Sequence, residues 1–133
     1  MKRAIASDRA PKAVGPYSQA VAFGDLLFCA GQIPLDPESG EIVGADAAAQ
    51  TERVIENIKA VLAVNAMTLG DVVKTTVFLT TMDDFTAMNE VYASHFVQPF
   101  PARSTVAVAA LPRGAKVEIE VTAAKVAGNG SKA

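Results

Sequence analysis

The chain has little of the chemistry on which many enzymes depend. Its 133 residues include one cysteine, Cys29, one histidine, His95, and no tryptophan. One cysteine cannot form an internal disulfide, and with a single histidine it offers no pair at metal-ligand spacing. A nucleophile activated by an imidazole would have to use His95, which lies beside an apolar helical stripe and is expected to pack at a helix end. We therefore expect neither a metal centre nor an activated nucleophile.

Strong charge of one sign and long apolar runs are also missing. The net charge is −2 and the isoelectric point is near 5.3, so the chain offers no basic field for nucleic acid or anionic lipid. No apolar run approaches the roughly 20 residues that a membrane helix needs. Lys2 and Arg3 are not followed by an apolar signal core. Together with the single cysteine, these features favour a reducing, cytoplasmic location.

What the chain does have is an ordinary globular composition. Half of its residues are apolar and 20% are charged, which argues against disorder. The length predicts one domain, expected over residues 1–127. Residues 128–133 are small and polar, and this tail is expected to be disordered.

Short apolar runs predict a series of strands. We expect them at residues 2–6, 19–23, 26–30, 72–79, 104–111 and 117–122. Gly24 and Asp25 suit the two central positions of a type II′ turn, so the second and third strands should form a hairpin. Cys29 alternates with its neighbours in that hairpin and is expected to be a small buried hydrophobe.

Two longer segments predict helices. Asp46 suits the N-cap of a helix that runs to about Asn65 with a single apolar stripe. Thr81, followed three residues later by Asp84, resembles a capping box. The helix that it opens carries a row of large core residues, namely Phe85, Met88, Tyr92 and Phe96.

The order of these elements indicates an α+β sandwich, in which two helices pack on one face of a mixed β-sheet. Residues 72–79 are apolar on both sides, which favours a central, covered strand. The opposite face of the sheet must be wet or covered by another chain. Because residues 104–111 are almost entirely Val and Ala, we favour a covered face and hence a homo-oligomer.

Arg103 is the first candidate binding residue. Pro99 and Pro101 restrict the backbone before it, so the guanidinium stands at the rigid entry of a strand. A planar, permanently charged group beside small apolar residues suits two-pronged binding of a carboxylate or phosphate. A solvated charge at a strand end is the alternative.

Four further residues are weaker candidates. Pro16 fixes the backbone before Tyr17, which is either presented to a ligand or a half-buried loop anchor. Gly31 follows an apolar strand and permits either a close approach to its backbone or a turn. Glu118 and Glu120 share one face of a strand in which Val117, Ile119 and Val121 share the other, and at least one glutamate is expected to be an ordinary solvated residue.

Several of these residues lie in segments that resemble the RidA (YjgF/L-PSP) family. The matching segments are GPYSQA at 15–20, GQIP at 31–34, GDVVKTTVFL at 70–79, PARSTV at 101–106 and VEIE at 117–120. The resemblance covers about residues 3 to 125, in order and at compatible spacing. It implies a chorismate-mutase-like fold, a homotrimer with clefts between subunits, and no metal or organic cofactor. It also implies hydrolytic deamination of reactive 2-imino or enamino acids, such as 2-iminopropanoate and 2-iminobutanoate, to 2-oxo acids and ammonia.

The same resemblance implies roles for individual residues. Arg103 would bind the substrate carboxylate, the backbone of Gly31 would add a second carboxylate contact, and Glu118 would position the attacking water. Tyr17 and Asn89 would line the cleft. The backbone carbonyl of Thr105 would contact the imine nitrogen, although many relatives have cysteine there. Glu120 would be an ordinary residue of the sheet face.

Three other functions remain open at this stage. The first is a regulatory trimer in which Arg103 binds a small carboxylate without turnover. The second is the endoribonuclease or translation-inhibitor activity that has been attached to the family, although the acidic isoelectric point disfavours RNA as a principal partner. The third is a specialised deaminase, for example of aminoacrylate or 2-aminomuconate.

Overall fold

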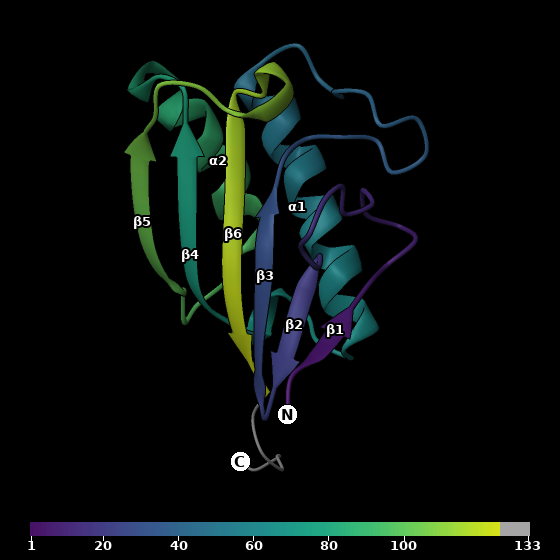
Figure 1. Cartoon of the computed structure of the whole chain (residues 1–133). Helices are drawn as coiled ribbons and strands as arrows, with labels where there is room; N and C mark the ends of the chain where they lie inside the picture. Colours follow the sequence, from purple (N-terminus) through teal and green to yellow (C-terminus); the bar gives the residue numbers. More distant parts are fainter. Residues whose placement is uncertain (126–133) are drawn as a thin grey trace.

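The structure is a computed structural model that describes residues 1–125 (Figure 1). Six strands form one sheet in the order β1-β2-β3-β6-β4-β5. Their bounds are β1 Arg3–Ile5, β2 Ala20–Phe23, β3 Leu26–Gln32, β4 Val72–Leu79, β5 Ala102–Ala107 and β6 Val117–Ala124. The helices are α1 (Ala47–Val64) and α2 (Phe85–His95). Because only the β4–β5 pair is parallel, the sheet is mixed, as the sequence predicted.

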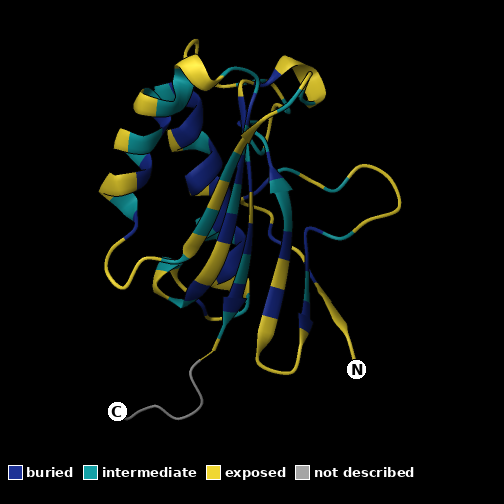
Figure 2. Cartoon of the chain, turned by 90° about the vertical axis from the view of Figure 1, so that its left-hand side faces the viewer, coloured by how far each residue is buried: buried dark blue, intermediate teal, exposed yellow. Residues whose placement is uncertain are grey.

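Both helices cover the same face of the sheet, and no other layer of the described residues covers the opposite face (Figure 2). The predicted α+β arrangement is therefore confirmed. Strand β6 shows how the pattern places the core: Val117, Ile119 and Val121 are buried beneath the helices, whereas Glu118 and Glu120 point to the other side. No helix among residues 1–125 is both long and apolar enough to span a bilayer.

The hairpin and the first helix form as predicted. Gly24 has a φ of 60°, and Asp25 is not among the residues with positive φ, which fits a type II′ turn between β2 and β3. The Asp46 carboxylate accepts a hydrogen bond from the backbone N–H of Ala49 at 2.9 Å and so caps α1. Cys29 is buried, and burial raises the pKa of its thiol to about 12, so that it behaves as a hydrophobe.

The predicted capping box at Thr81 is wrong. The Thr81 hydroxyl accepts a hydrogen bond from the Asp83 N–H, but it caps a one-turn 3₁₀ segment, and α2 itself begins at Phe85 without a side-chain cap. A capping box is present instead at Thr68 and Asp71. Both pairs have the same spacing, so the sequence pattern does not distinguish them.

The strand predicted at 104–111 is also wrong in its limits. Strand β5 begins at Ala102 and ends at Ala107. It lies at the edge of the sheet, where β4 is its one partner, and β4 ends at Leu79, which is paired with Ala107. Beyond the last ladder bond, from Val108 N–H to Leu79 O, the chain has no strand to pair with.

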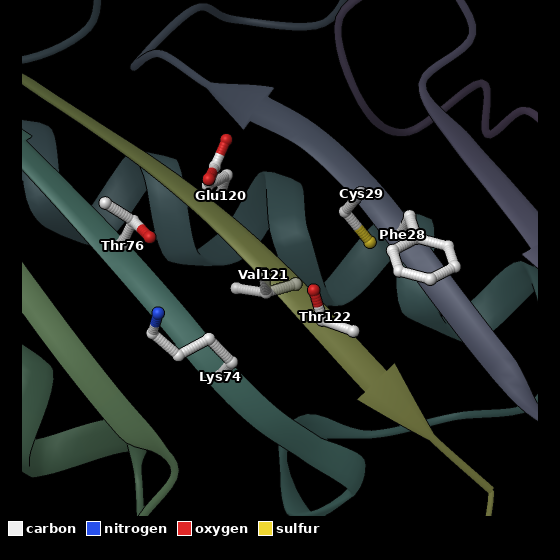
Figure 3. Close-up of a pocket in the computed structure, with 7 residues that line it drawn as sticks. All are labelled: Phe28, Cys29, Lys74, Thr76, Glu120, Val121 and Thr122. Carbon is white, nitrogen blue, oxygen red and sulfur yellow. The ribbon is translucent and has the colours of Figure 1, made fainter.

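The open face of the sheet is mixed rather than uniformly apolar. Phe28 on β3 and Val106 on β5 are 47% and 42% exposed there. Between them, Lys74, Thr76 and Glu120 line a shallow hollow of about 160 Å³ (Figure 3). Strand β4 is therefore internal within the sheet, as predicted, but a single chain covers only one of its faces. The expected boundary at residue 127 and the tail at 128–133 lie outside the described residues.

Candidate functional site

Arg103 is held rigidly against helix α2. It pairs with Thr75 across the β4–β5 ladder, and its side chain lies on the helix-covered face. The guanidinium carbon is 4.7 Å from the ring centroid of Tyr92 and 5.5 Å from that of Phe85. Its Nη1 donates a hydrogen bond to Oδ1 of Asn89 at 2.7 Å. Two aromatic rings and one amide therefore hold the cation in place.

Tyr92, which the sequence predicted only as a core residue, supports this arrangement. Its hydroxyl and that of Thr75 are 2.8 Å apart, and its ring stacks on Phe96 at 4.3 Å between centroids. Burial raises the pKa of Tyr92, although the Thr75 hydrogen bond and the charge of Arg103 oppose this, so the phenol remains neutral. The helical spacing of residues 85, 89 and 92 places their side chains on one face of α2. This spacing was the sequence signal for the three side chains that surround Arg103.

No carboxylate neutralises Arg103 within the described part of the chain. The two ion pairs among residues 1–125 join Lys59 to Glu56 and His95 to Glu52. Thr105 lies two residues after Arg103 on the same strand face, and its hydroxyl oxygen is buried without a hydrogen-bond partner. This part of the site thus presents a fixed cation next to an unsatisfied hydroxyl group. We call Arg103, Asn89 and Thr105 the arginine half.

A second group of candidates lies around a hollow of about 520 Å³, which Tyr17, Gly31 and Glu118 line. We call these three residues the glutamate half. The β3–β6 register shifts between Cys29 and Gln32, so that Gly31 stands in an irregular part of the strand rather than after it. The Glu118 side chain occupies the space where a Cβ on residue 31 would lie. The close approach to the Gly31 backbone that a glycine permits is therefore present, and the approaching group is the Glu118 side chain.

Glu118 is partly buried in this hollow. Burial raises the pKa of its carboxyl group, and the negative charge of Glu120 on the same strand face raises it further. A carboxylate whose pKa is raised binds a proton more readily than an ordinary surface glutamate. Such a group suits the transfer of a proton to and from a small ligand.

Gln19, which sequence reasoning missed, organises the loop that presents Tyr17. Its Oε1 accepts from the Ser7 N–H at 2.6 Å, and its Nε2 donates to the carbonyl oxygens of Ser7 and Pro11 at 3.2 and 2.7 Å. The sequence shows Gln19 only as a polar residue just before an apolar strand, and its burial becomes visible in the structure alone. Tyr17 itself is 53% exposed, so its ring is presented rather than packed.

The two halves do not meet within one chain. None of the arginine half lines the 520 Å³ hollow. Glu118 pairs with Phe78 on β4, whereas Arg103 pairs with Thr75, so the two side chains point to opposite faces of the sheet. They also stand on strands separated by β4.

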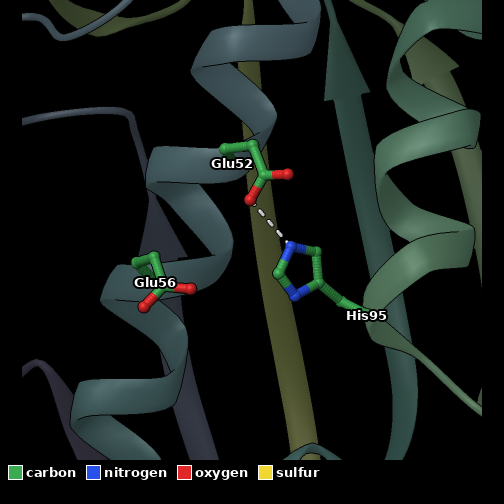
Figure 4. A group of neighbouring side chains, drawn as sticks. All are labelled: Glu52, Glu56 and His95. Atoms are coloured by element: carbon green, nitrogen blue, oxygen red, sulfur yellow. Dashed lines mark hydrogen bonds and ion pairs between the residues drawn. The ribbon is translucent and has the colours of Figure 1, made fainter.

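His95 occupies a separate position between the helices. Its Nε2 and Oε1 of Glu52 are 2.8 Å apart, and Glu56 lies nearby on α1 (Figure 4). The predicted packing at a helix end is thus accompanied by a hydrogen bond between helices. The ligand atoms of these three residues lie within 4.8 Å of one another, a grouping that the sequence did not predict. His95 and Glu52 satisfy each other, and Glu56 pairs with Lys59 at 3.1 Å.

The chain is similar to curated proteins over nearly its whole length. The endoribonuclease L-PSP family model matches residues 7–125. Protein DfrA of Myxococcus xanthus is 55% identical over 124 residues, which cover 92% of this chain and 95% of DfrA. The 2-iminobutanoate/2-iminopropanoate deaminase of Escherichia coli K12 is 44% identical over 128 residues, which cover 94% of this chain and 99% of that enzyme.

Solved structures show the same fold. A candidate endoribonuclease of Thermotoga maritima is 55% identical, with a TM-score of 0.92 over 95% of this chain and 99% of its own. TdcF of Escherichia coli, solved with bound serine, is 42% identical, with a TM-score of 0.87 over 93% of this chain and 99% of TdcF. The likeness therefore extends to the sheet, both helices and the loops between them.

Proposed function

The chain belongs to the RidA (YjgF/L-PSP) family, and from this membership we propose that it hydrolyses 2-imino and enamino acids to 2-oxo acids and ammonia. Its substrates would include 2-iminopropanoate and 2-iminobutanoate, the two named in its Escherichia coli relative. The reaction would remove reactive metabolites in the cytoplasm and would need no metal or organic cofactor.

The observation that carries this proposal is the geometry of Arg103. Its guanidinium is fixed by Tyr92, Phe85 and Asn89, and no carboxylate of the described chain pairs with it. An arginine held in place is preorganised for a carboxylate, which every 2-imino acid carries. TdcF, a relative of the same fold, was solved with serine, a small carboxylate.

We further propose that the complete site forms between neighbouring subunits of a homotrimer. The arginine half and the glutamate half point to opposite faces of one chain, so a small ligand touches both only if a second chain supplies one of them. The exposed Phe28 and Val106 on the open face favour such an assembly. Light scattering would give three times the 13.8 kDa subunit mass, whereas a stable monomer at micromolar concentration would contradict the trimer.

In the proposed reaction, Arg103 and the backbone of Gly31 orient the substrate carboxylate. Starting from the protonated imine, Glu118 accepts a proton from water as the water oxygen bonds to the imine carbon, and the electron pair of the C=N double bond moves to the nitrogen. The resulting carbinolamine carries the hydroxyl and the amino group on one carbon. Glu118 then returns its proton to the nitrogen, the C–N bond breaks to release ammonia, and the hydroxyl proton passes back to the Glu118 carboxylate as the oxo group forms. Because an imine is already electrophilic, no stronger nucleophile is required.

Two rival functions differ in what they need. An endoribonuclease is suggested by the name of the matched family model. However, the chain has one histidine, and that residue pairs with Glu52 rather than lining either half. A regulatory carboxylate-binding trimer would use the same Arg103 but would show no turnover.

The deciding test is hydrolysis of imines generated in situ by an amino-acid oxidase. Release of ammonia or oxo acid is measured with and without the protein, and cleavage of a single-stranded RNA is assayed in parallel. We expect acceleration of imine hydrolysis and no RNA cleavage. Turnover no faster than the buffer reaction, with carboxylate binding retained, would leave the regulatory function.

A further inference from the structure

The hollow beside Glu118 carries two cations that the proposed reaction does not use. Lys12 and Arg113 both line it. Lys12 comes from the loop before β2, and Arg113 from a one-turn 3₁₀ segment, η3 (Pro112–Gly114), so two distant parts of the sequence supply the same charge. Among the described residues that line the hollow, Glu118 is the one acidic residue.

The backbone at Arg113 is unfavourable for an arginine. Its φ of 61° and ψ of 16° lie in the left-handed region, where any residue with a Cβ is disfavoured. Gly114 follows with a φ of 72°, and a glycine at residue 113 would relieve the strain without altering the turn. Strained non-glycine residues cluster at ligand-binding positions, and here the left-handed backbone carries an arginine, rather than a glycine, that lines the hollow.

Within residues 1–125, neither cation has an acidic partner of its own. The ion pairs among residues 1–125 involve Lys59 with Glu56 and His95 with Glu52, and include neither Lys12 nor Arg113. Two cations against one partly buried carboxylate leave the hollow with an excess of positive charge. A ligand that brings a second negative group would balance this excess.

The hollow is also larger than a three-carbon imino acid. If each non-hydrogen atom took the ~30 Å³ of a liquid water, such a molecule would fill roughly 180 Å³. In a single chain, before the arginine half of a neighbouring subunit closes over it, the hollow measures about 520 Å³, and the loops that hold Lys12 and Arg113 line part of it. The hollow therefore has both unfilled volume and two positive charges in addition to Glu118.

We infer that Lys12 and Arg113 form a subsite for an acidic side chain, so that imino acids with a second carboxylate are preferred over aliphatic ones. This inference rests on the proposed function, because it assigns a substrate class to the same hollow. The 2-carboxylate would bind Arg103 of the neighbouring subunit, while the side-chain carboxylate would bind the two cations.

The test compares kcat/KM for imines generated from aspartate, glutamate and 2-aminoadipate with that for imines from alanine and leucine. Wild type, Lys12→Ala, Arg113→Gly and the double variant are assayed, with Lys116→Ala as control. Lys116 is an exposed cation three residues from Arg113 that does not line the hollow. We expect each single variant to lower the ratio of diacid to aliphatic turnover about fivefold, the double variant to lower it further than either, and the control not to change it.

Two further measurements separate this inference from the proposed function. Arg113→Gly should raise the thermal midpoint, since it relieves the left-handed arginine, while the substrate ratio falls. A lower midpoint together with an unchanged ratio would make Arg113 a turn residue and overturn the subsite. Binding of glutarate and butanoate by NMR titration needs no turnover. A glutarate preference lost in the double variant would uphold the subsite even if no imine is hydrolysed, and equal binding in all variants would overturn it.

Discussion

The side chain of Glu118 lies directly over Gly31, in the space that a Cβ would fill. A Cβ on residue 31 would stand 2.9 Å from Cδ of Glu118 and closer still to its Oε2. Because Gly31 has no side chain, the Glu118 carboxylate can occupy this position. Because the neighbouring atoms belong to the far end of a flexible side chain, a methyl group would displace the carboxylate rather than the strand.

We accordingly expect Gly31→Ala to lose activity without losing stability. Turnover should fall at least about tenfold because the carboxylate no longer meets the attacking water, while the thermal midpoint changes little. Gly70→Ala is the matched control, since its Cβ would meet Thr68 Oγ1 at an ordinary 3.4 Å. Kinetics and thermal unfolding of both variants check this. Full activity in Gly31→Ala would show that the position of Glu118 does not matter.

Arg103→Ala should lose the charge-assisted, two-pronged contact with the substrate carboxylate. The loss of transition-state stabilisation is on the order of 2–5 kcal/mol, which lowers kcat/KM about 30-fold to several thousandfold. Arg103→Lys should recover little, because an ammonium group cannot reproduce the planar fork or the stacking on Tyr92. The trimer content of each variant is checked by light scattering. Unimpaired hydrolysis in Arg103→Ala would remove the carboxylate contact from the mechanism.

Glu118→Gln and Glu120→Gln should differ sharply although the residues share a strand face. We expect the first to lose about a hundredfold in kcat and the second to stay within about threefold of wild type. Equal losses would show that the assignment of Glu118 is wrong.

The pH dependence tests the same pair. The proposed reaction needs the Glu118 carboxylate, so activity should fall as pH drops through its pKa. Burial and then the charge of Glu120 raise that pKa, so the acidic limb should lie at higher pH than for an ordinary glutamate. Glu120→Gln removes the second cause and should move the limb to lower pH. Wild type and Glu120→Gln are compared on the same substrate, so that the titration of the imine itself affects both pH profiles equally.

The buried hydroxyl of Thr105 yields a further prediction. If the backbone carbonyl makes the imine contact, the hydroxyl remains without a partner, and Thr105→Val should raise the free energy of unfolding by about 1 kcal/mol. Turnover should stay within about threefold of wild type, as it should in Thr105→Cys. A tenfold loss in the valine variant alone would assign the hydroxyl to the substrate.

Mixed trimers test the division of the site. Arg103→Ala and Glu118→Gln chains, refolded together in equal amounts, should recover about a quarter of wild-type activity, because random assembly leaves about one cleft in four with both halves intact. Glu118→Gln mixed with Gly31→Ala is the control, since both changes fall in the glutamate half and no cleft is restored. Absence of recovery in the first mixture would place the whole site within one chain.

Local patterns in the sequence predicted the helices and strands but not how they pair and pack against one another. Alternation in β6 and the cap at Asp46 depend on neighbouring residues, so both were predictable. The end of β5 depends on where β4 ends, and the face that Arg103 occupies depends on its pairing with Thr75. Such non-local contacts leave no signal in a single strand.

The same limit applies to the pocket. Lys12 and Arg113 lie 101 positions apart in the sequence and share a hollow only after the sheet has formed. Gln19 acts through hydrogen bonds to carbonyl groups, which carry no sequence signature. The resemblance to the RidA family implied roles for the candidate residues, but the strand register was needed to divide them into two halves.

The opposite orientation of Arg103 and Glu118 also affects how activity scales with the amount of protein. If each cleft needs two chains, dilution below the assembly constant removes whole sites rather than slowing each one. Specific activity would then rise with concentration, and halving gene dosage would more than halve the flux. A weakened interface would have the same outcome as a damaged active site, although every residue of the chemistry was intact.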